Sequence, residues 1–181
     1  HMRATGIVRR IDDLGRIVIP KEIRKTMHIR ESDPLEIFTE HDGSIILKKY
    51  SPIGEMGQIA KQYAESIAAT LPHTICICDQ DSVIAAAGPN GKKLSGKLLH
   101  EQAEQIIIDR GQFSAAKGDQ NFVPIISDFP DEFTNQAVAT IIAEGDAIGL
   151  VCILSNENKM NEQDLTIAKI GASFLGKQME D

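Results

Sequence analysis

Apolar and polar residues alternate along the first fifty positions, a pattern typical of strands that bury one face. A turn at residues 12–15 joins the first two predicted strands, with Gly15 supplying the positive φ that such a turn needs. Pro20 then begins a short helix, because its fixed φ and missing N–H suit the first helical position. The predicted order is strand, strand, helix, strand, strand. The strands cover residues 5–11, 16–19, 35–39 and 44–50.

The pattern changes after Ser51-Pro52, where longer helical periods and buried apolar runs begin. The predicted helices cover residues 55–71, 97–110 and 161–179, and the predicted strands cover residues 74–78, 82–87, 137–143 and 147–154, as two hairpins. Residues 111–136 carry no regular pattern and are expected to be irregular. The chain is therefore interpreted as two domains, residues 1–52 and residues 53–181, and the second has the pattern of an α/β domain.

The charge of the chain is unevenly divided between these two parts. Overall the chain holds 19 Lys and Arg against 26 Asp and Glu, a net charge of −7. Residues 1–50 hold ten basic and eight acidic side chains, whereas residues 51–181 hold nine and eighteen. Residues 3–30 carry eight basic side chains against three acidic ones. Such asymmetry indicates a nucleic-acid surface, so the acidic total does not exclude DNA.

The first domain is too small to be comfortably stable alone, since a domain below about 60 residues buries too little surface. It contains no cysteine and no cluster of metal ligands that could compensate. Oligomerisation is the remaining way to complete its core, through pairing of edge strands from two copies. We therefore expect an obligate dimer through residues 1–52.

Five basic side chains lie at structurally constrained places in this domain. Arg9 and Arg10 end the first predicted strand, Arg16 follows the turn, and Arg24 and Lys25 lie on the helix. Arginine presents a planar fork of donors that fits phosphate and guanine, so such a cluster on a two-fold scaffold suits duplex DNA. Composition alone leaves a solvated charged surface as the alternative, because a local excess of five charges is modest.

A resemblance to a known family changes this weighing. Residues 5–27, together with residues 33–37 and 46–50, resemble the AbrB family of transition-state regulators nearly residue for residue. The resemblance implies a dimer that exchanges hairpins between its two chains and binds DNA through arginines. It also implies a sequence-specific transcription regulator, activator or repressor, of genes expressed during sporulation.

The family arginines correspond by motif to Arg9 in Gly-Ile-Val-Arg, to Arg16 in Leu-Gly-Arg and to Arg24 in Glu-Ile-Arg. The fourth falls on Lys25, and Arg10 keeps a basic position beside Arg9. Lysine retains the charge but lacks the bidentate fork, so a phosphate contact suits Lys25 better than a base contact. Which of these residues reads bases is not decided by the sequence.

The second domain resembles GAF-like domains at residues 77–81 and 146–151. In that fold a ligand sits between the sheet and the irregular segments covering it, which here would be residues 88–96 and 111–136. The polar or histidine groups of cyclic-nucleotide and haem-binding members are not recognisable here, so no cofactor is assigned. An unidentified small-molecule pocket and a purely structural role in assembly stay open as alternatives.

No catalytic or metal site is predicted, and we do not expect an enzyme. The histidines are scattered without metal-ligand spacing, and no Ser or Cys lies beside a recognisable base. Asp12 and Asp13, adjacent in a turn, are interpreted as solvated or as orienting a neighbouring arginine. Cys76 and Cys78 share one face of a strand, where packing in the core is favoured over redox sensing.

No apolar run reaches the roughly 18 residues of a membrane-spanning helix, and no signal peptide is recognisable. We therefore expect a cytoplasmic, nucleoid-associated protein with no membrane partner. The predicted helices 55–71 and 161–179 both carry apolar stripes, so two dimers are expected to associate further into a tetramer. The rivals to a DNA-binding regulator are the antitoxin of a toxin-neutralising pair and a small-molecule sensor whose first domain only dimerises it.

Overall fold

The computed structural model describes residues 2–180. The chain forms two compact units, one ending at Tyr50 and the other beginning at Ser51. We refer to residues 2–50 as the head and to residues 51–180 as the second domain.

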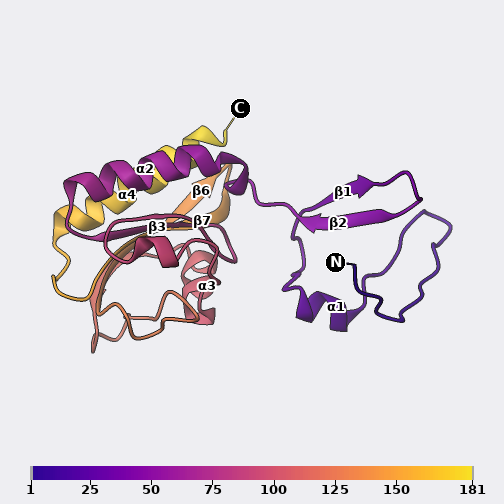
Figure 1. The fold of residues 1–181 in the computed structure, drawn as a ribbon, viewed down its shortest axis with the longest axis horizontal. Coiled ribbons are helices and arrows are strands. Elements are labelled where there is room, and N and C mark those ends of the chain that lie inside the picture. The colour runs from indigo at the N-terminus through magenta and orange to yellow at the C-terminus, as the bar shows by residue number, and fades with distance from the viewer. Residues whose placement is uncertain (1, 181) are drawn as a thin grey trace. The chain divides into compact units, whose positions relative to one another are not determined.

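The head contains one short helix and one regular hairpin (Figure 1). Helix α1 (Lys21–Thr26) follows Pro20, which caps the helix from extended backbone and so lies one position before the helix that it was predicted to begin. Strands β1 (Leu35–Thr39) and β2 (Ile45–Lys49) pair in antiparallel register, as the sequence predicted.

Residues 5–11 and 16–19, predicted as strands, have no regular strand partner within the single chain. Their connecting turn is present: the Asp12 N–H donates to the Arg16 carbonyl at 3.0 Å, and Gly15 has the expected positive φ of 77°. A strand is defined by its hydrogen-bonded ladder, so two segments without a neighbour do not form one. A second copy of the chain would have to supply that neighbour.

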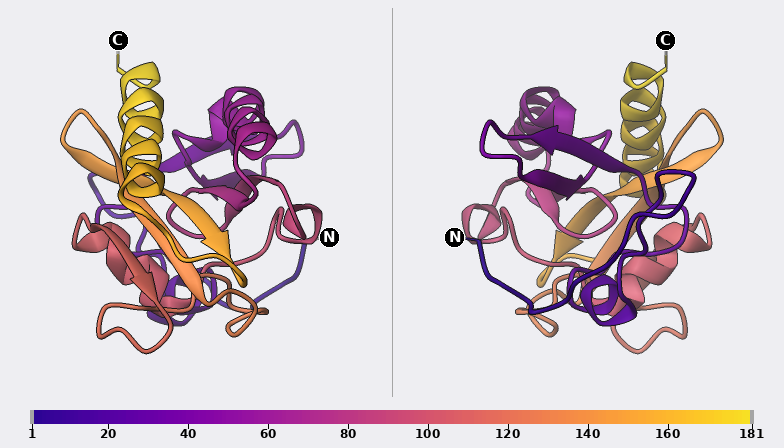
Figure 2. Two further views of the ribbon diagram at one scale, coloured as in Figure 1. Left: turned by 90° about the vertical axis from the view of Figure 1, so that its left-hand side faces the viewer. Right: turned by 90° about the vertical axis from the view of Figure 1, so that its right-hand side faces the viewer.

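The second domain is built on one antiparallel sheet of five strands in the order β4-β3-β7-β6-β5. Helices α2 (Gly57–Thr70) and α4 (Glu162–Gln178) cover one face, and helix α3 (Glu101–Ile108) covers the other (Figures 1 and 2). The strands are β3 (Thr74–Cys78), β4 (Val83–Ala87), β5 (Gln112–Ala116), β6 (Asn135–Ala143) and β7 (Asp146–Ser155). The two predicted hairpins, β3–β4 and β6–β7, are confirmed.

Helix α4 begins where its sequence places a capping box. The Asn161 side chain accepts the Asp164 N–H at 2.8 Å, and the Asp164 carboxylate accepts the Asn161 N–H at 2.9 Å. Two of the unpaired donors at the start of the helix are thereby satisfied. Asp164 is buried, and it also lies 3.5 Å from the His73 imidazole next to β3. The start of α4 is thus tied to the sheet.

Two predicted boundaries in the second domain are wrong. The helix predicted from residue 97 begins at Glu101, because residues 97–100 are extended and bridge to other segments, and the His100 side chain caps the helix. Residues 111–136, expected to be irregular, contain β5 and the start of β6. Strand β5 is rich in small and polar residues, which give a weak strand signal, and its pairing with β6 stabilises it.

The core of the second domain consists of two layers, one on each face of the sheet. One packs α2 and α4 against the sheet through residues such as Ile75, Ile153 and Leu175. The other packs α3 and the covering segments against the opposite face, and Cys76, Cys78 and Cys152 belong to it. In residues 2–180, no helix is long and apolar enough to cross a membrane.

Candidate nucleic-acid interface

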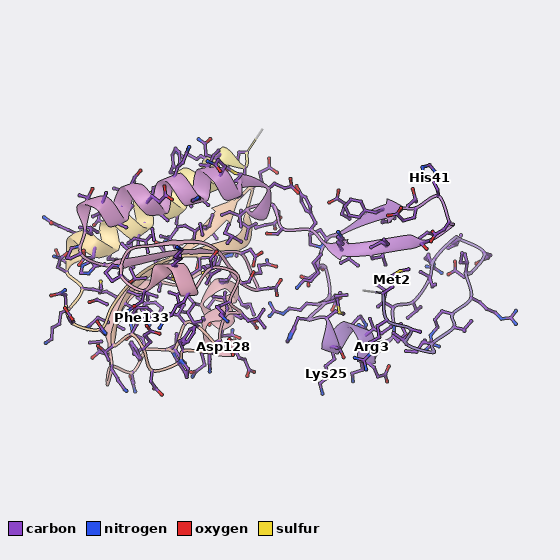
Figure 3. The ribbon with its side chains drawn as sticks, viewed as in Figure 1. Met2, Arg3, Lys25, His41, Asp128 and Phe133 are labelled. Carbon is purple, nitrogen blue, oxygen red and sulfur yellow. The ribbon has the colours of Figure 1, made fainter. Side chains whose placement is uncertain are left out.

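All five basic residues singled out from the sequence are exposed on the head: Arg9, Arg10, Arg16, Arg24 and Lys25. They come from the turn region and from α1. The Arg24 Nε donates to the Ile19 carbonyl at 3.1 Å, which holds its side chain against the start of the helix. Lys25 projects from α1 on the side away from the β1–β2 hairpin (Figure 3).

The turn before Arg16 is organised by a single carboxylate. The Asp12 Oδ1 accepts the Leu14 N–H at 2.9 Å and the Arg16 N–H at 2.8 Å, and Oδ2 accepts the Arg16 Nε at 2.7 Å. These hydrogen bonds, with the Arg16 backbone N–H the strongest, lower the pKa of Asp12. The carboxylate therefore stays ionised at neutral pH. The expectation that it orients a neighbouring arginine is confirmed.

The head has almost no interior of its own. Among residues 2–50 only Pro20 is buried, while Val8 is 85% exposed and Val18 is 70% exposed. The other large hydrophobic side chains left exposed in this unit are Met2, Ile7, Ile11, Leu14, Ile17, Met27, Ile37, Phe38, Ile45 and Leu47. A folded domain does not leave so much apolar surface in water, so this unit is incomplete as a single copy.

In the second domain, the face on which a GAF-like ligand was expected is filled by the protein's own side chains. Leu94, Ile126 and Phe133 are buried there beneath the covering segments. Figure 3 labels Phe133 together with Asp128 on this part of the chain. Lys93 lies over the Phe129 ring and pairs with Glu132 at 2.6 Å, which fastens the two covering segments together.

A hollow of about 380 Å³ lies instead on the outer face of α4, lined by Thr166, Lys169, Ile170, Ser173, Phe174 and Lys177. Ile170 is 60% exposed and Phe174 is 43% exposed, one helical turn apart. The Phe174 ring stacks on Tyr63 of α2 with 6.0 Å between ring centroids. Sequence reasoning had only counted Ile170 and Phe174 among the residues flanking the α4 stripe; their spacing of four was the available signal. In residues 2–180, no group of three potential metal ligands is present.

Comparisons with known proteins agree with this division of the chain. A family model described as stage V sporulation protein T C-terminal, transcription factor, matches residues 55–180. A second model, described as antidote-toxin recognition MazE, bacterial antitoxin, matches residues 8–55.

Relatives cover the two parts differently. Stage V sporulation protein T of Bacillus subtilis is 46% identical over 179 residues, which is 99% of this chain and 99% of the relative. Transition state regulatory protein AbrB of the same organism is 59% identical over 51 residues, covering 28% of this chain and 52% of AbrB. The cofactor-binding GAF domain of the nutrient sensor CodY from Clostridium difficile shares 15% identity with a TM-score of 0.50, covering 66% of this chain and 83% of that one.

The matches define a two-domain transcription factor with an AbrB-like head and a GAF-like second domain. The chain belongs to the stage V sporulation protein T family. At 15% identity the likeness to CodY shows the fold alone, so no ligand follows from it.

Proposed function

We propose that this transcription factor binds specific duplex DNA sequences through two heads that exchange hairpins. Arg9, Arg10, Arg16, Arg24 and Lys25 of both copies would face one stretch of DNA. The observation that carries the proposal is the exposure of all five basic side chains on a unit whose apolar side chains are also exposed. The charges suit phosphates and guanine edges, and the apolar surface requires a second copy.

Dimerisation of the head follows from its missing interior. Full burial of a Val or Ile side chain contributes roughly 1.5–3 kcal/mol. Val8, Ile11, Ile17 and Val18 of two copies would therefore contribute substantially to one shared core. Pairing residues 5–11 and 16–19 with the second copy would also give these segments the ladder they lack.

We place the further assembly of dimers into a tetramer on the second domain. Ile170 and Phe174 expose an apolar patch on α4 beside Tyr63 of α2. Two such faces would bury these side chains against each other. A particle with two pairs of heads would bind adjacent DNA sites with a higher effective concentration.

An assembly role suits the second domain better than sensing of a small molecule, because side chains fill the expected ligand face. The antitoxin model matches the head alone, whereas the relative matching 99% of the chain is a sporulation protein, so no toxin partner is proposed. The proposed role is to bind and not to catalyse. It places the protein in the cytoplasm, on the nucleoid, with no membrane partner.

Duplex binding should depend steeply on salt, since neutralised phosphates release counterions. Fluorescence anisotropy of a labelled duplex, measured across a salt series, gives the slope of log affinity against log salt. Arg9→Ala and Arg24→Ala should each lower that slope by about 0.9 for every phosphate that is no longer neutralised, which is about two for a dimer. Lys159→Ala, an exposed change in the second domain, is the control and should leave the slope unchanged. Unchanged slopes in both arginine variants would contradict the assigned interface.

A further inference from the structure

The Asp12–Arg16 pair stands apart from the other arginines of the head. Arg9 and Arg24 donate to backbone carbonyls, those of Val8 and Ile19, both at 3.1 Å. Arg16, unlike these two, forms an ion pair within the described chain, with 2.7 Å between its Nε and the Asp12 Oδ2. A carboxylate on a surface meant for phosphates opposes general attraction to DNA, so its position requires a reason.

The geometry gives that reason. Asp12 first closes the turn through the Leu14 and Arg16 backbone N–H groups, so its carboxylate is fixed in place. It then holds Arg16 by Nε, while the arginine side chain remains 70% exposed. The two terminal nitrogens of a guanidinium have the spacing of the guanine O6 and N7 acceptors. A side chain held in advance loses less freedom on binding.

We propose that Asp12 is a positioning residue for DNA recognition, which holds Arg16 by Nε so that Nη1 and Nη2 meet a guanine edge. The proposal rests on the proposed DNA-binding function and assigns the role of base reading to Arg16. The Asp12 charge has a second effect, because it repels a phosphate that would otherwise compete for the same guanidinium. Asp12 therefore raises discrimination between sequences at the expense of general affinity.

The test uses the full-length protein and two duplexes. A randomised duplex library is first selected with the wild type, and the selected duplex is then compared with a scrambled duplex of the same length and composition. The readouts are the ratio of the two affinities and the salt slope on each duplex. Asp12→Asn keeps an oxygen that can accept the turn N–H groups but removes the charge that holds Arg16 Nε.

Asp12→Asn should lower the affinity ratio about tenfold, the middle of the range for one bidentate base contact. Affinity for the scrambled duplex should rise as the salt slope steepens by about one per released arginine. Asp13→Asn removes the same charge from the neighbouring turn position and should leave the ratio unchanged. Arg16→Ala should lower the ratio at least as much as Asp12→Asn.

An unchanged ratio in Asp12→Asn would overturn the proposal, as would equal gains on both duplexes, because Arg16 would then be contacting phosphate. Loss of the ratio with an altered melting temperature and near-ultraviolet spectrum would assign Asp12 a role in folding instead. A wild type that binds neither duplex would refute the proposed function itself, which keeps the two failures apart.

Discussion

Three cysteines show how burial sets chemistry at the level of single residues. Cys76 lies directly opposite Cys152 in the β3–β7 register, and both are fully buried with Cys78. Burial raises the pKa of Cys76 well above its ordinary value, and a hydrogen bond with the Cys152 thiol, together with burial, does the same for Cys78. These two thiols are therefore neutral at physiological pH, and a neutral thiol is a poor nucleophile.

Native protein should accordingly resist thiol reagents. We expect all three cysteines to react with a chromogenic disulfide more than about a hundredfold faster in guanidinium than in native buffer, because reaction requires opening of the core. Ser95→Cys, which places a thiol at an exposed loop position, should react at once in the native protein. A native cysteine that reacts as fast as this added one would restore the redox-sensing interpretation.

At this scale the sequence predicted the identity of the important residues but not their partners. The motif identified Arg9, Arg16 and Arg24, and the alternation of β3 placed Cys76 and Cys78 on one face. The link between Asp12 Oδ2 and Arg16 Nε depends on the turn adopting one particular conformation, and no spacing rule specifies that.

Secondary-structure elements were predicted well where they carry their own signal. Helix α4 combines an apolar stripe with a capping box, and β3 is an uninterrupted apolar run. The boundaries failed where tertiary contacts decide. Leu98 and Leu99 suited a helical stripe, but the bridges of residues 82 to 98 and 99 to 126 hold them extended. Strand β5 became visible only through its neighbour β6.

The glycines of the helices give a test of packing at the element scale. A Cβ added to Gly176 in α4 would lie 2.1 Å from the Ile142 carbonyl oxygen of β6, which is backbone and cannot rotate away. Replacing a helical glycine by alanine ordinarily stabilises a protein by about 1 kcal/mol. Here the close approach should reverse the sign.

Gly176→Ala should destabilise the protein by about 1–3 kcal/mol, the usual range for an overpacked core. Gly57→Ala, at the start of α2 with nothing within 4 Å of the added carbon, is the matched control and should be neutral or slightly stabilising. Urea unfolding followed by circular dichroism measures both. Equal effects of the two changes would show that α4 moves away from β6 without loss of stability.

For the whole molecule, the net charge of −7 is the sum of two opposite parts. The acidic excess belongs to the second domain, while the basic residues of the head remain exposed for DNA. The sequence of one chain predicted that the head needs a partner, because a unit of that size lacks a core. It could not predict which surface of the second domain remains open, since that depends on how α2 and α4 pack together.

The apolar patch on α4 supports the last prediction, which concerns the assembly. Ile170 projects into water with 60% of its surface exposed, so Ile170→Glu adds a charge to the proposed interface without disturbing the core. Burial of that charge between two copies is unfavourable, because a carboxylate without a partner loses its hydration. The change should split the tetramer into dimers while the heads stay paired.

Sedimentation velocity at micromolar concentration should therefore show wild-type tetramers and Ile170→Glu dimers. Gln178→Glu introduces the same charge at an exposed position on the same helix, outside the hollow, and should remain tetrameric. Affinity for a duplex with one selected site should be unchanged in Ile170→Glu, because one pair of heads is sufficient for it. Affinity for a duplex with two such sites should fall by about a hundredfold, the gain that linkage of two binding units provides. If Ile170→Glu sediments as a tetramer, or the wild type as a dimer, the α4 patch is not the interface between dimers.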